Sequence, residues 1–207
     1  TSSRRFVIGM TDVGEIYFVP SLMRIISKLA PGVTISTVRN SRVNLKVEME
    51  DGLVDLAIGL LPDLKNDFYQ RRLFRQGYAC LFRVGHPFDG VPFGVDEFAA
   101  AEHVVVVSSG TGHGKTDELI ERSAVRRNVR LRVPHFVALP YILEETDLVA
   151  TVPERIAMRL ASSFPLLFVP HPLDLPDIQI NLFWHAKYHR DAGSQWLRTL
   201  ICETFGN

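Results

Sequence analysis

The first 58 residues alternate short apolar runs with helical patterns, and this order narrows the possible folds more than any other feature of the chain. The runs at residues 6–10, 33–38 and 54–58 have the length and apolar character of buried strands. Between them, residues 15–30 and 45–49 place apolar side chains at helical spacing. A β-α-β-α-β order predicts a parallel sheet with helices on its faces.

The pattern changes further along, where extended runs at 68–73 and 78–84 follow each other without a helix between them. Four consecutive valines at 104–107 predict a buried parallel strand, and residues 116–124 predict an amphipathic helix after it. The remaining expected elements are a strand at 129–133, a helix at 139–143, a strand at 148–152, a helix with Pro153 in its first position, a strand at 178–184 and a helix that ends near Phe205. The chain therefore predicts two β/α groups, followed by one more strand and helix.

Composition excludes several classes of protein. The 207 residues are 46% apolar and 22% charged, which is typical of a globular domain and not of a disordered chain. Lys and Arg number 23, as do Asp and Glu, and a neutral chain lacks the basic character of a duplex-binding domain. No apolar run is long enough to cross a membrane. Cys80 and Cys202 are isolated, and we expect both to be buried free thiols.

Two segments at the ends of predicted strands are candidate anion sites. The glycine-rich segment 108–114 precedes the helix predicted at 116–124, although its glycine spacing differs from that of a phosphate-binding loop. Its backbone amides either bind a small anion at the helix start or form a plain strand-to-helix turn. Thr11 follows the first strand and has the same two interpretations, a ligand for a carboxylate or a helix N-cap.

The histidines and arginines offer weaker candidates. His113 and His135 each follow a predicted strand, where open α/β sheets bind ligands. His185 and His189 are four residues apart but lack a nearby third ligand, so we expect no metal site. The only basic cluster is interpreted as a solvated helix-to-strand face; it consists of Arg122, Arg126, Arg127, Arg130 and Arg132.

Seven stretches spread along the chain follow one pattern: Met10-Thr-Asp-Val-Gly-Glu-Ile-Tyr-Phe18, Asp55-Leu-Ala-Ile-Gly-Leu-Leu-Pro62, Gln70-Arg-Arg-Leu-Phe74, Thr111-Gly-His-Gly114, Pro134-His-Phe136, Thr146-Asp-Leu-Val-Ala-Thr-Val-Pro153 and Ile180-Asn-Leu-Phe-Trp-His-Ala-Lys-Tyr188. This pattern resembles the effector-binding region of LysR-type transcriptional regulators. The resemblance covers essentially the whole chain. It is nearest to the salicylate-responsive subgroup that controls aromatic degradation.

The resemblance implies a fold of two Rossmann-like α/β subdomains joined by two crossover strands, similar to type II periplasmic binding proteins. Subdomain I would take residues 1–72 and 168–207, and subdomain II residues 73–167. The effector would lie in the cleft between them. The N-terminal winged helix-turn-helix of the family is absent from this sequence, so we expect the chain to be a fragment.

The resemblance also implies a set of effector contacts, carried over by position. They are Thr11 and Phe18 in the first subdomain, Thr111, His113, Pro134 and His135 in the second, and Phe183 and Trp184 near the crossover. Gln76 occupies a position where the salicylate responders carry His. Glutamine donates and accepts hydrogen bonds but carries no charge, which favours a related aromatic acid over salicylate itself.

On this basis we expect a cytoplasmic ligand-sensing domain that binds a small aromatic carboxylate and controls transcription of a catabolic operon. The implied partners are a second copy of this fragment, a homotetramer at full length, and DNA through the missing N-terminal domain. No cofactor, metal or membrane is expected. An alternative is a periplasmic-type solute-binding protein for a small organic anion. An enzyme is not expected, because no nucleophile, base and orienting group occur together.

Overall fold

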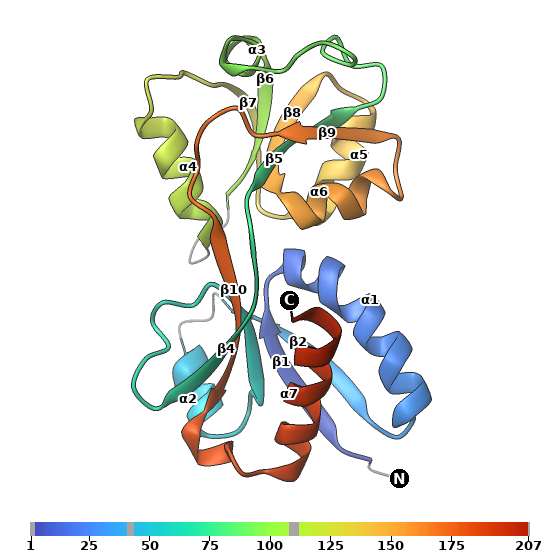
Figure 1. Ribbon diagram of the computed structural model, residues 1–207, viewed down its shortest axis with the longest axis vertical. Coiled ribbons are helices and arrows are strands. Elements are labelled where there is room, and N and C mark those ends of the chain that lie inside the picture. Colours follow the sequence, from blue (N-terminus) through green and yellow to red (C-terminus); the bar gives the residue numbers. More distant parts are fainter. Residues whose placement is uncertain (1–2, 41–43, 108–111, 207) are drawn as a thin grey trace. The chain divides into compact units, whose positions relative to one another are not determined.

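A computed structural model describes residues 3–40, 44–107 and 112–206, with the backbone alone described at residues 112 and 113. The chain forms two compact units, Thr1–Arg75 with Gln179–Asn207, and Gln76–Ile178. Each unit contains one mixed five-stranded sheet covered by helices (Figure 1), which confirms the predicted α/β class. No helix in the described part of the chain is both long and apolar enough to span a bilayer.

The sheet of the first unit has the strand order β2-β1-β3-β10-β4. β1 pairs in parallel with both β2 and β3, as the alternating pattern predicts, whereas β10 runs antiparallel to β3. The last strand of the chain therefore completes the sheet begun by the first. The strand bounds are β1 Arg5–Met10, β2 Thr34–Arg39, β3 Leu56–Gly59, β4 Phe68–Gln76 and β10 Ile178–His185.

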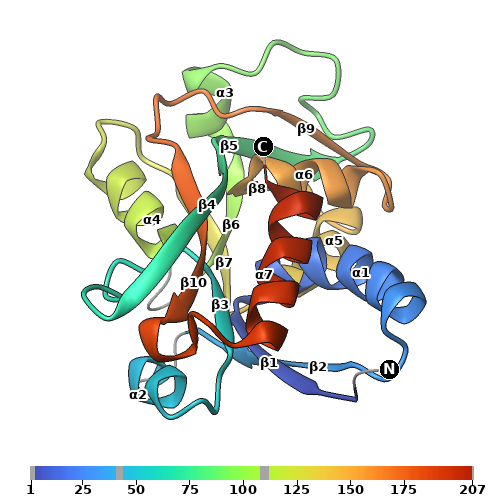
Figure 2. The same ribbon diagram turned by 60° about the horizontal axis from the view of Figure 1, so that its bottom comes forward.

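Helices cover both faces of this first sheet. α1 (Asp12–Leu29) and α7 (Ala192–Phe205) lie side by side on one face (Figure 2), and α2 (Leu45–Glu50) packs on the other. Alternation along the strands separates the two cores, since Phe6 and Ile8 face α1 and α7 while Val7 faces α2. A short 3₁₀ turn, η2 (Ala186–Tyr188), follows β10.

The second unit has the strand order β7-β6-β8-β5-β9. β6 is parallel to both β7 and β8, which confirms a buried parallel strand at residues 104–106, whereas Val107 lies beyond the strand and is 51% exposed. β5 is antiparallel to β8 and β9. The strand bounds are β5 Tyr78–Arg83, β6 Glu102–Val106, β7 Asn128–Val133, β8 Leu148–Pro153 and β9 Leu166–Pro170.

The helices of the second unit also divide between two faces. α3 and α4 pack against the face that carries Cys80 and Phe82, whereas α5 and α6 contact β5, β8 and β9. Both cysteines are buried free thiols, as expected. The bounds are α3 Val95–Ala100, α4 Gly112–Arg122, η1 Phe136–Ala138, α5 Leu139–Glu144 and α6 Glu154–Ala161.

The structure differs from the sequence-based expectation at several places. α4 begins at Gly112, so part of the predicted glycine-rich loop is helical. Pro153 ends β8 and is the N-cap of α6, not its first helical residue. α3 and β9 were not predicted. The units divide at Arg75/Gln76 and Ile178/Gln179, whereas the boundary expected at 167/168 falls inside β9.

Candidate functional site

The N-terminus of α1 follows β1 at the carboxyl end of the parallel strands, where open α/β sheets bind ligands. Thr11 has extended backbone angles, and its Oγ1 accepts a hydrogen bond from Gly14 N at 3.3 Å. The N-cap interpretation of Thr11 is therefore confirmed. A hydroxyl that accepts one bond still has its own hydrogen to donate, so the same side chain retains a donor for a carboxylate.

The three aromatic residues predicted near the effector are all buried in the first unit. Phe18 is 3% exposed and packs against Phe74 and Phe205, with a ring separation of 4.9 Å to the latter. Phe183 belongs to the core on the α2 side, and Trp184 to the core shared by α1 and α7. The structure therefore places Phe18 and Phe183 on opposite faces of one sheet and does not bring them together.

Trp184 is held by polar and charged neighbours. Its Nε1 donates to His189 Nδ1 at 3.1 Å, and the guanidinium carbon of Arg198 lies 4.4 Å from the ring centre. His185 Nδ1 accepts from Lys187 N, so the two histidines spaced four apart both make structural hydrogen bonds. Among the residues that the structure describes, no group of three His, Cys, Asp or Glu side chains is arranged to hold a metal.

Gln76 lies at the start of the second unit and is 7% exposed. Its Oε1 accepts a hydrogen bond from Arg155 N at 3.1 Å. Arg155 is the second residue of α6, whose own N-cap, Pro153, provides no side-chain cap. Gln76 thus satisfies an amide that the helix leaves open at its N-terminus, which is a role usually played by an N-cap side chain.

The remaining predicted contacts follow the parallel strands of the second unit. Thr111 lies outside the described residues, and His113 is in the first turn of α4. Pro134 is exposed directly after β7, and His135 is a half-buried residue in extended conformation that precedes η1. The structure therefore puts His113 and the segment at Pro134 and His135 after the carboxyl ends of the neighbouring parallel strands β6 and β7.

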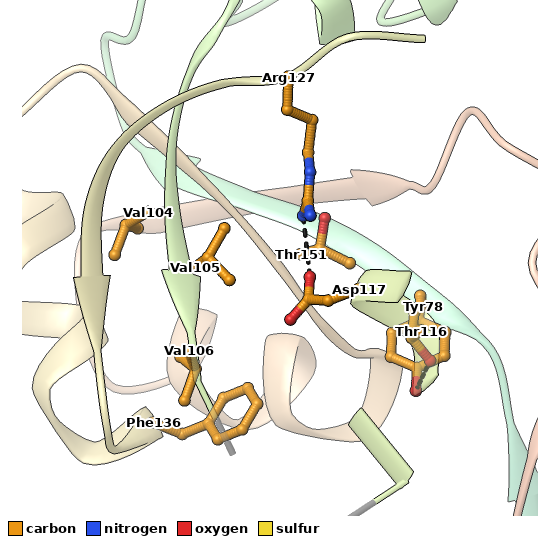
Figure 3. A pocket seen from close by; sticks show the side chains of 9 residues that line it. All are labelled: Tyr78, Val104, Val105, Val106, Thr116, Asp117, Arg127, Phe136 and Thr151. Carbon is orange, nitrogen blue, oxygen red and sulfur yellow. Dashed lines mark hydrogen bonds and ion pairs between the residues drawn. The ribbon is translucent and has the colours of Figure 1, made fainter. Parts of the chain in front are cut away.

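A small cavity lined by both polar and apolar side chains lies under the first turns of α4 (Figure 3). Its volume is about 10 Å³, enough for about one water molecule, and β6 and Phe136 line one side. On the other side, Thr116 Oγ1 donates to Tyr78 Oη at 2.6 Å, and Arg127 Nη1 donates to Asp117 Oδ1 at 2.9 Å.

Arg127 corrects the interpretation of the basic cluster as a solvated face. Its side chain is 3% exposed and points into the cavity, whereas Arg122 and Arg130 are mostly exposed. Its Nη2 is buried and has no hydrogen-bond partner among the described residues. Burial raises the pKa of Asp117, an effect larger than the opposing hydrogen bond and charge of Arg127.

Four buried titratable side chains of the second unit, Tyr78, Cys80, His103 and His171, are neutral at pH 7. Burial raises the pKa of Tyr78 to about 12 and raises that of Cys80, so the thiol is not a reactive thiolate. Burial lowers the pKa of His171 to about 4 and also lowers that of His103. The Asp117–Arg127 pair is therefore the charged feature of this interior, which suits polar binding or positioning better than covalent catalysis.

Sequence reasoning missed the residues that build this cavity. Asp117 and Arg127 have no distinctive spacing, and Tyr78 and Thr116 occur within ordinary strand and helix patterns. A single signal was present in Thr116 and Asp117, which follow the glycine-rich segment directly and so had to lie near the carboxyl end of β6.

Comparison with known proteins gives concordant results. The model of the LysR substrate binding domain family matches residues 1–206. The HTH-type transcriptional activators NagR of Ralstonia sp and NahR of Pseudomonas putida are 53% and 49% identical to the chain, and in each case the match covers 99% of this chain and 68% of the relative. The regulatory domain of MexT, a transcriptional activator in Pseudomonas aeruginosa, superimposes with a TM-score of 0.83 at 25% identity, over 97% of this chain and 99% of that one. A putative transcriptional regulator from Vibrio parahaemolyticus gives a TM-score of 0.87 at 24% identity, over 98% and 95% of the two chains. These neighbours confirm the predicted fold class.

Proposed function

The chain belongs to the LysR substrate binding domain family, and from this premise we propose that it is the sensor of a transcriptional regulator that binds a small aromatic carboxylate in the cleft between its two units. The relatives are transcriptional regulators, and the chain is not an enzyme. Ligand binding would change how copies of the protein pack and thereby redirect a separate N-terminal DNA-binding domain. The regulated genes would form a catabolic operon, as the resemblance to aromatic-degradation regulators implies.

The observation that carries the ligand class is the N-terminus of α1. A helix N-terminus has a partial positive charge, which favours an anion, although in α1 Gly14 N and Val13 N already donate to Thr11 Oγ1 and Asp12 Oδ1. Thr11 adds a hydroxyl with a remaining donor beside those amides. We infer that Thr11, His113 and His135 provide the polar contacts, with the carboxylate at α1.

Gln76 bears on which acid is bound. The side chain is 7% exposed and its Oε1 is engaged at α6, so it offers no charge to a carboxylate. We therefore propose an aromatic acid related to salicylate but not dependent on a cationic partner at this position.

A thermal-shift screen tests the ligand class directly. A ligand at 100 times its Kd stabilises the folded state by about 2.7 kcal/mol. For a chain of this size that corresponds to a rise in Tm of roughly 5–10 °C. Benzoate, salicylate and their substituted relatives are expected to give such shifts, and a sugar and a neutral amino acid serve as controls. A clear shift with the controls alone would refute the proposal and favour a solute-binding protein.

We also propose that this fragment forms a head-to-tail homodimer in which α1 of one copy packs against α4 of the other, and that the full-length protein is a tetramer in the cytoplasm. Leu29 on α1 is 64% exposed and Leu119 on α4 is 42% exposed, so each helix has an apolar side chain available for a partner. Light scattering at about 100 μM should detect the dimer, because an interface with a Kd in the μM range is populated there. A monomer at that concentration would contradict this assembly.

A further inference from the structure

Two buried polar contacts hold one turn of α4 against the rest of the second unit (Figure 3). Thr116 bonds to Tyr78 at the start of β5, and Asp117 pairs with Arg127, which precedes β7. Thr116 is 4% exposed, and the Arg127 side chain is 3% exposed. The two contacts come from adjacent residues of the helix and lead to different parts of the sheet.

Stability alone does not account for the Asp117–Arg127 pair. Nη2 of Arg127 is buried without a hydrogen-bond partner, and the nearest oxygen of Glu121 lies 4.0 Å away. Removing two charges from water costs more than an incompletely bonded pair returns, and apolar replacements of similar volume are often as stable or more stable. The Asp117–Arg127 pair is therefore expected to contribute little net stability, which leaves a role in positioning α4.

Apolar packing holds α4 further along the helix, where Ile120 is fully buried in a core with Phe98 and Val149. The cavity of about 10 Å³ lies directly beside Thr116 and Asp117, between these residues and the valines of β6. Groups that line such a space have fewer packing contacts on that side. The two polar contacts therefore attach α4 to the rest of the unit at the residues that line this cavity.

We propose that Asp117 and Arg127 are positioning residues, which fix the first turn of α4, where His113 lies, in the placement that binds the effector. The inference rests on the proposed function, because it assigns the pair a role toward an effector that His113 contacts. It predicts that affinity for the effector, and not the stability of the fold, depends on the pair.

The test uses the double variant Asp117→Asn with Arg127→Met, because removing one partner alone would leave an uncompensated buried charge. The matched control is Glu118→Gln, which breaks an exposed pair with Arg122 on the same helix, where the charged atoms are 3.7 Å apart. Three quantities are measured: Tm, amide hydrogen exchange of the peptide 112–122, and the Kd for salicylate and benzoate by titration calorimetry.

For the double variant we expect a Tm near or above that of the wild type. We expect amide exchange at the start of α4 to be about tenfold faster and the Kd to rise about tenfold, a change of about 1.4 kcal/mol in binding free energy. The control should match the wild type in all three measurements. The single variant Arg127→Lys keeps the positive charge but not the planar guanidinium. Its Kd should lie between those of the wild type and the double variant.

Unchanged exchange or unchanged affinity in the double variant would overturn the inference. A double variant that fails to fold would overturn the prediction that stability does not depend on the pair. Asp117→Glu, which keeps the charge balance and lengthens the side chain by one methylene, then tests the positioning role, and an unchanged Kd would overturn that role. A wild-type chain that binds neither acid would refute the proposed function instead, whereas the exchange measurement would still show whether the pair fixes α4.

Discussion

Replacing Gln76 by His changes a residue that serves a helix and, on our proposal, lies near the effector. In the wild type, Oε1 accepts from Arg155 N at 3.1 Å at the N-terminus of α6. A neutral imidazole can also accept a hydrogen bond through one ring nitrogen, whereas a protonated imidazole has donors only. Protonation of the introduced side chain would therefore remove the helix cap and at the same time provide a cation for a carboxylate.

The two effects have opposite signs and comparable size. Loss of a side-chain cap costs about 0.5–2 kcal/mol, and a charge-assisted hydrogen bond to a carboxylate contributes about 1.5–3 kcal/mol. The expected net gain in affinity for salicylate at low pH is about 1 kcal/mol, or roughly fivefold. Burial disfavours the charged imidazole, so its pKa in the ligand-free folded state lies below the unfolded value of about 6.5. The imidazole's contribution to the stability of the ligand-free variant is therefore present above about pH 6.5. It is lost as pH falls from about 6.5 through the lower pKa of the folded state, since the unfolded chain binds more protons.

The assay combines titration calorimetry with salicylate at pH 6 and pH 8 and thermal unfolding without ligand at both values. Gln76→His should bind salicylate more tightly at pH 6 than at pH 8 and unfold at a lower temperature at pH 6. Gln76→Leu is the control, because it removes the cap at both pH values and adds no titrating group. Equal affinity and equal Tm at the two pH values in Gln76→His would show that the residue neither contacts the effector nor caps α6.

Three further changes probe the first unit. Thr11→Ala removes an N-cap worth about 1 kcal/mol, so thermal unfolding should show a Tm lower by about 2–4 °C. Calorimetry should show weaker binding of salicylate and of benzoate alike, by about 0.5–1.5 kcal/mol. The N–H of Ser194 and the guanidinium of Arg4 hold the pKa of Asp191 below its usual value, so Asp191→Asn should destabilise the protein by less than about 1 kcal/mol at pH 7. That difference should shrink in urea titrations as pH falls from 5 toward 2; a constant difference would contradict the role of the charge. Leu197→Ala removes a fully buried side chain between α7 and the sheet and should cost about 2–5 kcal/mol in the same titrations, and a loss below 1 kcal/mol would contradict the packing.

The sequence predicts elements well where a continuous apolar pattern exists and poorly where few side chains are buried. α3 has a single buried residue, Phe98, so its six residues show no helical period. β9 is short, with only Leu166 buried before half-buried and exposed positions alternate, and its pairing with β5 involves residues far away in sequence. Both elements are defined by long-range pairing or capping, which local periodicity does not contain.

The candidate site shows the same division. Thr11 was predictable because a strand end and a helix start are both visible around it. Arg127 was not, because it is one of five arginines in a short segment, and only the packing of α4 determines which one turns inward. Gln76 was found by position in a known pattern, but its bond to Arg155 depends on two segments that meet only in the folded unit.

The second unit is a continuous stretch of chain inserted into the first, and this has a consequence for the order of folding. Its ends lie together, since a Cβ atom on Gly77 would be 3.5 Å from Asp177 Oδ1. During synthesis, residues 76–178 are complete before β10 and α7 emerge, so this unit can fold while the first still lacks its last strand and helix. Once folded, it holds β4 and the start of β10 close to each other. The entropy cost of closing the loop of residues 76–178 is then already met before the first sheet forms. The inserted unit therefore acts as a template that shortens the effective contact order of the unit that surrounds it.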